Sequence, residues 1–178
     1  FMKGLFTSFD LKGYHTIILD YEGDEYTPVG NLYDASFIKV SGEESRYFNT
    51  IAIGDLTGIK KIDRDLKNEA VKITERVFSL LLDEKNGMTS HELSLYSDCV
   101  NRVYEKFGIT DDPETWHLSK ECTYFHLYGE LVEMSKEDGY VREYGLHIKD
   151  MIIKLRTYFE FDGINRSMFL NPINLEEI

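Results

Sequence analysis

Four carboxylates near the start of the chain are the residues whose type and spacing best suit chemistry. Asp20, Glu22, Asp24 and Glu25 directly follow residues 14–19, a run rich in Thr and Ile. Such a run predicts a buried strand, and ligands of open α/β sheets bind at the carboxyl ends of strands. The carboxylates there could hold a magnesium ion beside a nucleotide. The alternative is that Asp20 caps a turn and the other three are solvated loop charges.

Other catalytic patterns are absent from the sequence. No G-x-x-x-x-G-K-[ST] motif occurs, and residues 54–58 are not followed by Lys-Ser or Lys-Thr, so this chain cannot cradle a triphosphate in the P-loop manner. The five histidines lack the H-x-x-x-H and H-E-x-x-H spacings, and we expect no metal site from them. No G-x-S-x-G elbow or catalytic-cysteine signature is present.

The first third of the chain is expected to supply the elements that position these carboxylates. Residues 1–9 have the apolar spacing of a helix, and residues 14–19 and 37–40 read as strands. Residues 47–53 are expected to be extended before the glycines at 54 and 58. A helix followed by a buried strand is typical of an α/β fold.

From about residue 65 the apolar period becomes helical. Thr89 and Glu92 form a capping box that begins a second helix, which Gly108 ends, and Asn86-Gly87 closes the helix before it. Further stripes predict helices around residues 124–134 and 148–159. We expect a compact antiparallel bundle over residues 65–160, with a core that includes Ile73, Val77, Leu81, Val100, Tyr104, Leu131, Ile152 and Leu155.

Charge, cysteine content and hydropathy disfavour a nucleic-acid-binding, a disulfide-bonded and a membrane-spanning protein. Lys and Arg number 20 against 32 Asp and Glu, a net charge of −12, which disfavours direct binding of nucleic acid by this chain. Cys99 and Cys122 have no C-x-x-C partner and suit free thiols in the cytoplasm. No run is long enough to span a bilayer.

Several motifs resemble one known family, the VirB-type traffic ATPases that drive conjugation and type IV secretion. Residues 19–26 resemble its D-x-E-G-x-E-Y-like stretch, and Asn49-Thr50-Ile51 resembles its N-P-[IL] segment, with Thr50 in place of the usual proline. Residues 88–92 and 104–110 are similar to the insert helix that opens L-T-x-x-E and closes Y-x-x-x-G-I. The resemblance covers nearly the whole chain.

This resemblance implies a fold class and a division of the chain. We expect an α/β part of a RecA-like P-loop core that carries a mainly α-helical inserted bundle, with helix dominant by residue count. Residues 1–62 would be the partial ATPase core, residues 63–162 the helical insert, and residues 163–178 the return segment to the core. The ATP-binding loop and the principal Walker B acid would lie outside this chain, in its parent protein.

The resemblance also implies the function and the partners. Asp20, Glu22 and Glu25 would flank the nucleotide site of the complete parent, with Glu25 the better candidate for orienting water. ATP and magnesium would be cofactors of the parent, whereas this chain alone is expected to bind neither and to be inactive. Its partners would be other secretion subunits and further copies of the parent, at the cytoplasmic face of the membrane.

Two other readings remain open at this stage. The chain could be a complete, non-enzymatic helical interaction module whose acidic surface docks a basic partner. Alternatively, the carboxylates of residues 20–25 could form a divalent-metal site of a small hydrolase, because clustered carboxylates suit magnesium or calcium.

Overall fold

A computed structural model describes residues 26–32, 46–59 and 63–173 of the chain. The chain divides into two compact units, residues 1–38 and 39–178, and each is described by itself. In the first unit the described element is the short helix α2 (Thr27–Leu32).

Several sequence predictions concern residues that the structure does not describe. These are the helix over residues 1–9, the strands over residues 14–19 and 37–40, and the two ends of the partial core, residues 1 and 62.

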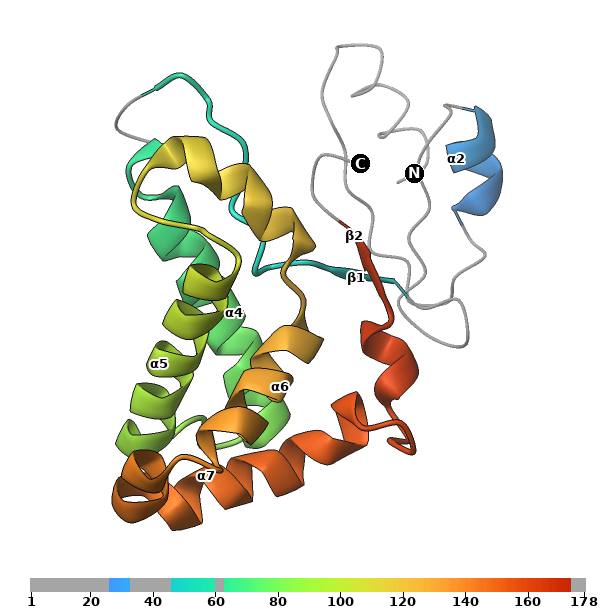
Figure 1. Cartoon of the computed structure of the whole chain (residues 1–178). Coiled ribbons are helices and arrows are strands. Elements are labelled where there is room, and N and C mark those ends of the chain that lie inside the picture. Colours follow the sequence, from blue (N-terminus) through green and yellow to red (C-terminus); the bar gives the residue numbers. More distant parts are fainter. Residues whose placement is uncertain (1–25, 33–45, 60–62, 174–178) are drawn as a thin grey trace. The chain divides into compact units, whose positions relative to one another are not determined.

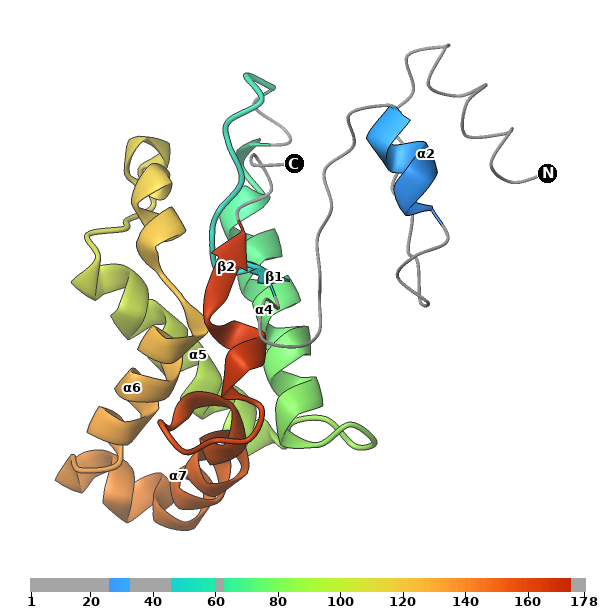
Figure 2. The ribbon, with the colours of Figure 1, turned by 90° about the vertical axis from the view of Figure 1, so that its right-hand side faces the viewer.

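The second unit is dominated by helices, as the sequence predicts. Its principal helices are α4 (Leu66–Leu82), α5 (Ser90–Lys106), α6 (Tyr124–Met134) and α7 (Asp138–Phe159). Helices α4, α5 and α6 form the body of the bundle, and α7 lies across one end of them, in contact with all three (Figures 1 and 2). At the opposite end lies the 3₁₀ helix η1 (Pro113–Glu121), drawn in yellow in Figure 1.

Two short parallel strands lie on either side of the bundle in the sequence. Strand β1 (Arg46–Phe48) precedes it, and β2 (Asn171–Ile173) follows it after the short 3₁₀ helix η2 (Arg166–Phe169). Arg46 pairs with Asn171 and Phe48 with Ile173. The chain therefore leaves one strand, builds the whole bundle, and returns to the strand alongside.

Helix α5 begins and ends where its local sequence predicts. The Glu92 amide donates to Thr89 Oγ1 (3.3 Å), and the Thr89 amide donates to Glu92 Oε2 (2.7 Å), which completes the capping box. At the other end Gly108 adopts φ +76°, and the Ile109 amide donates to the Tyr104 carbonyl (2.9 Å). This left-handed ending is the Schellman motif, which glycine adopts without the steric cost of a Cβ atom.

The core of the bundle comes chiefly from α5, α6 and α7. The predicted core residues Val100, Tyr104, Leu131 and Leu155 are buried. They belong to one continuous cluster that also includes Leu95, Tyr96, Cys99, Leu127, Met134, Ile148, Met151 and Phe159.

Helix α4 turns a different face to the core than the sequence predicts. Ile73, expected in the core, is 48% exposed, and Val77, Leu81 and Ile152 are only half-buried at its edge. The buried row consists of Ala70, Thr74, Phe78 and Leu82. Both rows have helical spacing, so periodicity alone does not choose between them.

An aromatic contact explains the choice of face. Phe78 is completely buried, and its ring packs 5.6 Å from Tyr96 and 6.2 Å from Tyr124 between ring centroids. An aromatic ring buries more apolar surface than the β-branched Ile73, so the helix turns Phe78 inward and Ile73 outward.

The prediction of an extended segment over residues 47–53 is only partly right. The strand ends at Phe48, and the chain turns at residues 50–52. Ile51 and Ile53 are buried at 1% exposure each, because the turn brings both side chains against the bundle. The segment is therefore a docked turn after a short strand.

Candidate functional site

The three predicted catalytic acids, Asp20, Glu22 and Glu25, lie outside the residues that the structure describes. The structure therefore places none of them relative to the bundle or to each other. Three other polar regions are described: a turn that joins β1 to the bundle, a surface pocket, and an ion-pair cluster.

The joint segment, residues 49–53, is fixed to the bundle by hydrogen bonds from both backbone and side chains. Asn49 Nδ2 donates to the Cys122 carbonyl (2.9 Å), and the Ile53 amide donates to Ser119 Oγ (2.7 Å). The Tyr104 hydroxyl donates to the Ile51 carbonyl (2.8 Å). Because these partners are buried or partly buried, each bond that is lost would leave a polar group without compensation.

Thr50 occupies the centre of the joint segment. Its Oγ1 lies 2.5 Å from the Tyr124 hydroxyl and 3.0 Å from Thr74 Oγ1. Burial raises the pKa of Tyr124 to about 12, so this phenol remains protonated at neutral pH and can donate. The Thr50 hydroxyl thus contacts both α4, through Thr74, and α6, through Tyr124.

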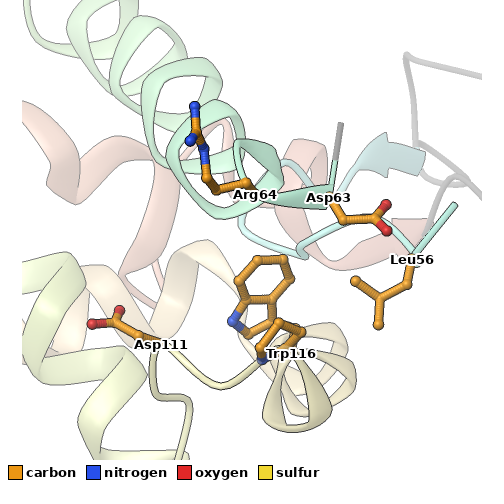
Figure 3. Close-up of a pocket in the computed structure, with 6 residues that line it drawn as sticks. Leu56, Asp63, Arg64, Asp111 and Trp116 are labelled. Atoms are coloured by element: carbon orange, nitrogen blue, oxygen red, sulfur yellow. The ribbon is translucent and has the colours of Figure 1, made fainter. Parts of the chain in front are cut away.

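A pocket lies where the residues after the joint segment meet the start of α4 and η1 (Figure 3). Its volume is about 400 Å³, within the range of small-molecule sites. It is lined by apolar and charged residues: Leu56, Asp63, Arg64, Asp111, Pro113 and Trp116.

The carboxylates of this pocket are already occupied as hydrogen-bond acceptors. Asp63 accepts from the Thr57 hydroxyl and amide at 2.7 Å each, and these bonds lower the pKa of Asp63. Asp111 accepts from Lys67 Nζ (2.9 Å), which lowers the pKa of Asp111. Both groups are therefore ionised at neutral pH, which suits ion pairing better than general acid or base catalysis.

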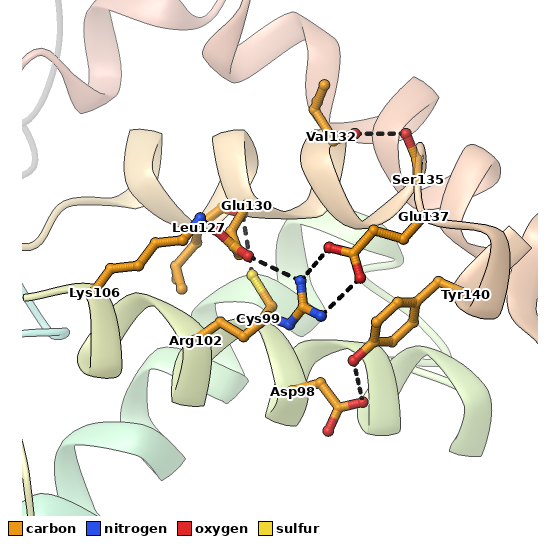
Figure 4. Close-up of polar contacts among 10 residues, drawn as sticks. All are labelled: Asp98, Cys99, Arg102, Lys106, Leu127, Glu130, Val132, Ser135, Glu137 and Tyr140. Carbon is orange, nitrogen blue, oxygen red and sulfur yellow. Dashed lines mark hydrogen bonds and ion pairs between the residues drawn. The ribbon is translucent and has the colours of Figure 1, made fainter.

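The third polar region, the ion-pair cluster, joins α5 to α6 and to the start of α7 (Figure 4). The Glu130 side chain is 3% exposed and lies between Lys106, which donates to Oε2, and Arg102 (Nη1 to Oε1, 3.4 Å). Arg102 also donates from Nη2 to Glu137 Oε2 (2.8 Å) and stacks 5.0 Å from the centre of the Tyr140 ring.

This ion-pair cluster is organised for stability. The hydrogen bonds that Arg102 donates to Glu137 raise the pKa of Arg102, so the guanidinium stays charged. Beside it, burial raises the pKa of the Cys99 thiol, which donates to the Leu127 carbonyl (3.1 Å). Burial likewise raises the pKa of Cys122 to about 12. Two neutral, buried thiols are poor nucleophiles.

Within the described residues, no group of three or more His, Cys, Asp or Glu side chains is placed to hold a metal ion. In the same part of the chain, no helix combines the length and the apolar character needed to cross a bilayer.

Sequence reasoning missed the pocket and the ion-pair cluster because their members are far apart in the chain. A local signal exists for one edge of the pocket. Asp112 and Pro113 read as a helix cap and a first-turn proline, and Asp112 Oδ1 does accept from the Glu114 amide (3.1 Å). The approach of Asp63 and Leu56 to this turn has no such local signal.

Comparison with known proteins gives no relative: no family model, no curated protein and no solved structure matches this chain.

Proposed function

We propose that this chain is part of a VirB-type motor ATPase of conjugation and type IV secretion, in which the helical bundle is an insert in a RecA-like core. The observation that supports it most is the pairing of β1 with β2. Two parallel, neighbouring strands bracket the bundle, which is the connectivity of an insert in a parallel sheet.

The size and exposure of this strand pair support the same proposal. Parallel strands require a crossover connection, and here the crossover is the entire bundle. Strands of three residues each are too short to form a stable sheet alone. Phe48, the last residue of β1, and Leu170, just before β2, are 42% and 44% exposed, which favours further structure packed against them in the parent.

The joint segment would couple such a core to the insert. Asn49, Thr50 and Ile51 lie immediately after β1, and each of them bonds to the bundle. A displacement of β1 during an ATPase cycle would therefore move the bundle with it, since the joint segment holds several buried hydrogen bonds at once.

The chemistry of the proposed parent depends on groups beyond the described residues. ATP and magnesium would be bound mainly by the P-loop and Walker B acid of the parent, and Asp20, Glu22 and Glu25 would flank them. Without the phosphate-binding loop this chain alone would be inactive. It would work at the cytoplasmic face of the membrane, among secretion subunits and further copies of the parent.

Two measurements test the proposal. The reading frame around this sequence should encode G-x-x-x-x-G-K-[ST] upstream, and the complete product should hydrolyse ATP. In equilibrium dialysis with labelled ATP, this chain alone should show no saturable binding in the micromolar range, since it lacks the phosphate-cradling amides and lysine. A frame without that motif, or micromolar binding at one site per chain, contradicts the proposal.

The completeness of the helical core favours a second candidate, a stand-alone acidic interaction module. The buried cluster runs without interruption through α4, α5, α6 and α7, so the bundle contains enough core to fold by itself. A reading frame that holds little more than this chain would support the module and exclude the motor.

A further inference from the structure

The outward face of α7 carries a regular row of basic and aliphatic side chains. Helix α7 buries Ile148, Met151, Leu155 and Phe159 against the other helices. On its opposite side a single row of exposed residues follows spacings of four and three. This row, the α7 stripe, consists of Arg142, Leu146, Lys149, Ile153 and Arg156.

The two aliphatic side chains of the stripe are unusually open to solvent. Leu146 is 85% exposed and Ile153 is 63% exposed. Single exposed aliphatics are normal on protein surfaces. Two of them one heptad apart on one face are the arrangement that helix pairing uses, because a straight partner helix contacts the same face at each heptad.

The cations of the stripe are largely uncompensated. Arg156 pairs with Glu160 (3.0 Å), whereas Arg142 and Lys149 make no ion pair with any residue in the described part of the chain. Of the acids nearest in sequence, Asp150 is already paired with Lys154 (2.6 Å). Within the described residues, the stripe therefore offers two cations, Arg142 and Lys149, that are available to pair with acids of a partner.

We infer that the α7 stripe docks an acidic amphipathic helix of a partner protein. In heptad notation Leu146 and Ile153 occupy a positions, and Arg142, Lys149 and Arg156 occupy d positions. The partner would present aliphatic residues one heptad apart to the a positions and Asp or Glu to the d positions. Such an arrangement neutralises Arg142 and Lys149 and covers both aliphatics together.

The geometry favours a helix over other anionic partners. The stripe runs straight for about 21 Å along α7, four turns of helix, which matches a partner helix of similar length. An anionic membrane or a nucleic acid would meet the same cations, but its broader surface would also meet the exposed acids Glu143 and Asp150, whereas a helix can contact the single row alone. This inference stands independently of the ATPase proposal.

Helix α4 offers a matched control surface. Its outward Ile73 and Leu80 are 48% and 60% exposed and also lie one heptad apart. Their row contains Glu69, Arg76 and Asp83, so its charge is mixed and it should not attract an acidic helix. The comparison of α4 with α7 separates a specific docking face from general apolar exposure.

The test is binding of a synthetic acidic peptide of about three heptads, with Leu at a and Glu at d, to the full 178-residue chain. Fluorescence anisotropy of the labelled peptide should show saturable binding. The double variant R142E/K149E and, separately, L146A/I153A should each weaken binding by about tenfold or more. The control K72E/R76E, with the same charge change on α4, should alter it by less than about twofold.

Several results would overturn the inference. These are absence of binding, equal binding of a scrambled peptide, or equal losses in the α7 and α4 variants. Sedimentation velocity that shows self-association abolished by R142E/K149E would assign the stripe to a second copy instead. Stripe-dependent binding to vesicles of anionic lipid, without binding of the peptide, would assign it to a membrane. Circular dichroism on every variant excludes loss of folding as the cause.

Discussion

At the scale of single residues, Thr50 has the largest role that the sequence alone does not reveal. It is half-buried, and its hydroxyl reaches Tyr124 on α6 and Thr74 on α4. The joint segment thus depends on one hydroxyl that contacts two helices at once. The three acids of the proposed nucleotide site remain a prediction from sequence, because they lie outside the described residues.

We predict that Thr50→Val destabilises the chain by about 1–3 kcal/mol, because the buried Tyr124 hydroxyl then loses its closest hydrogen-bond partner while the side-chain shape is kept. Urea denaturation at neutral pH measures the free energy of unfolding. Thr157→Val, at an exposed position on α7, is the matched control and should change it by less than about 0.5 kcal/mol. Equal effects of the two substitutions would refute the role given to Thr50.

In a complete, hydrolytically active parent, we predict that Glu25→Gln lowers kcat by about 100-fold or more with little change in ATP affinity. A carboxylate that orients the attacking water loses its basicity in the amide, while size and polarity are kept. Steady-state kinetics and nucleotide binding should be compared with those of Glu22→Gln. Unchanged kcat in both variants means that the catalytic assignment is wrong. A raised KM at constant kcat indicates that the carboxylate stabilises bound ATP and the transition state equally.

At the scale of elements, the helices show which local rules held and which did not. The capping box of Thr89 and Glu92 and the glycine at 108 set the ends of α5 as predicted. Helix α4 carries two candidate apolar rows; of the predicted one, Ile73 is exposed and Val77 and Leu81 are only half-buried. Phe78 decided the rotation, since its ring finds Tyr96 and Tyr124 only when it faces inward.

Neighbouring residues on α7 give a direct test of this burial pattern. Leu155 is completely buried and Ile153 is 63% exposed. Leu155→Ala should cost about 2–5 kcal/mol, because it removes buried methyl groups and leaves a cavity. Ile153→Ala should cost less than about 0.5 kcal/mol. Thermal and urea unfolding would check both, and comparable losses at the two positions would show that the outward face of α7 is misassigned.

At the scale of the whole molecule, several ion pairs and hydrogen bonds of the bundle join elements that are distant in sequence. Arg102 ties α5 to Glu137 at the turn between α6 and α7, and Lys67 ties α4 to Asp111 ahead of η1. Tyr128 of α6 donates to Glu160, just after α7 (2.7 Å). Each of these contacts uses a carboxylate as acceptor. Protonation of that carboxylate weakens the contact, so the stability of the bundle depends on pH.

Stability should fall as the solution becomes acidic. Hydrogen bonds from Arg102 lower the pKa of Glu137, and those from Tyr128 and Arg156 lower the pKa of Glu160. A carboxyl with a lowered folded-state pKa stabilises the fold above its unfolded value of 4.5, and this contribution is lost as pH falls through the folded pKa.

The measurement is the urea midpoint between about pH 6 and about pH 3. Glu137→Gln should flatten the decline below pH 4.5, because one of the linked carboxyls is gone. Glu133→Gln, which removes an exposed carboxylate paired with Lys136 within the same turn, is the comparison. A decline of the same steepness in wild type and Glu137→Gln would show that the Arg102 contact does not contribute.

The sequence by itself determined the helical character of residues 65–160, the capping of α5, most of the core of α5, α6 and α7, and the acidic net charge. These properties are local or compositional: caps bond within one turn, and periodicity is written into neighbouring residues. Only the tertiary structure decided the rotation of α4, the docking of the joint segment, the pairing of β1 with β2, and the outward placement of the α7 stripe. Each of these depends on partners far away in the chain, since the burial of Phe78 or the bond from Thr50 to Tyr124 exists only once the helices have packed.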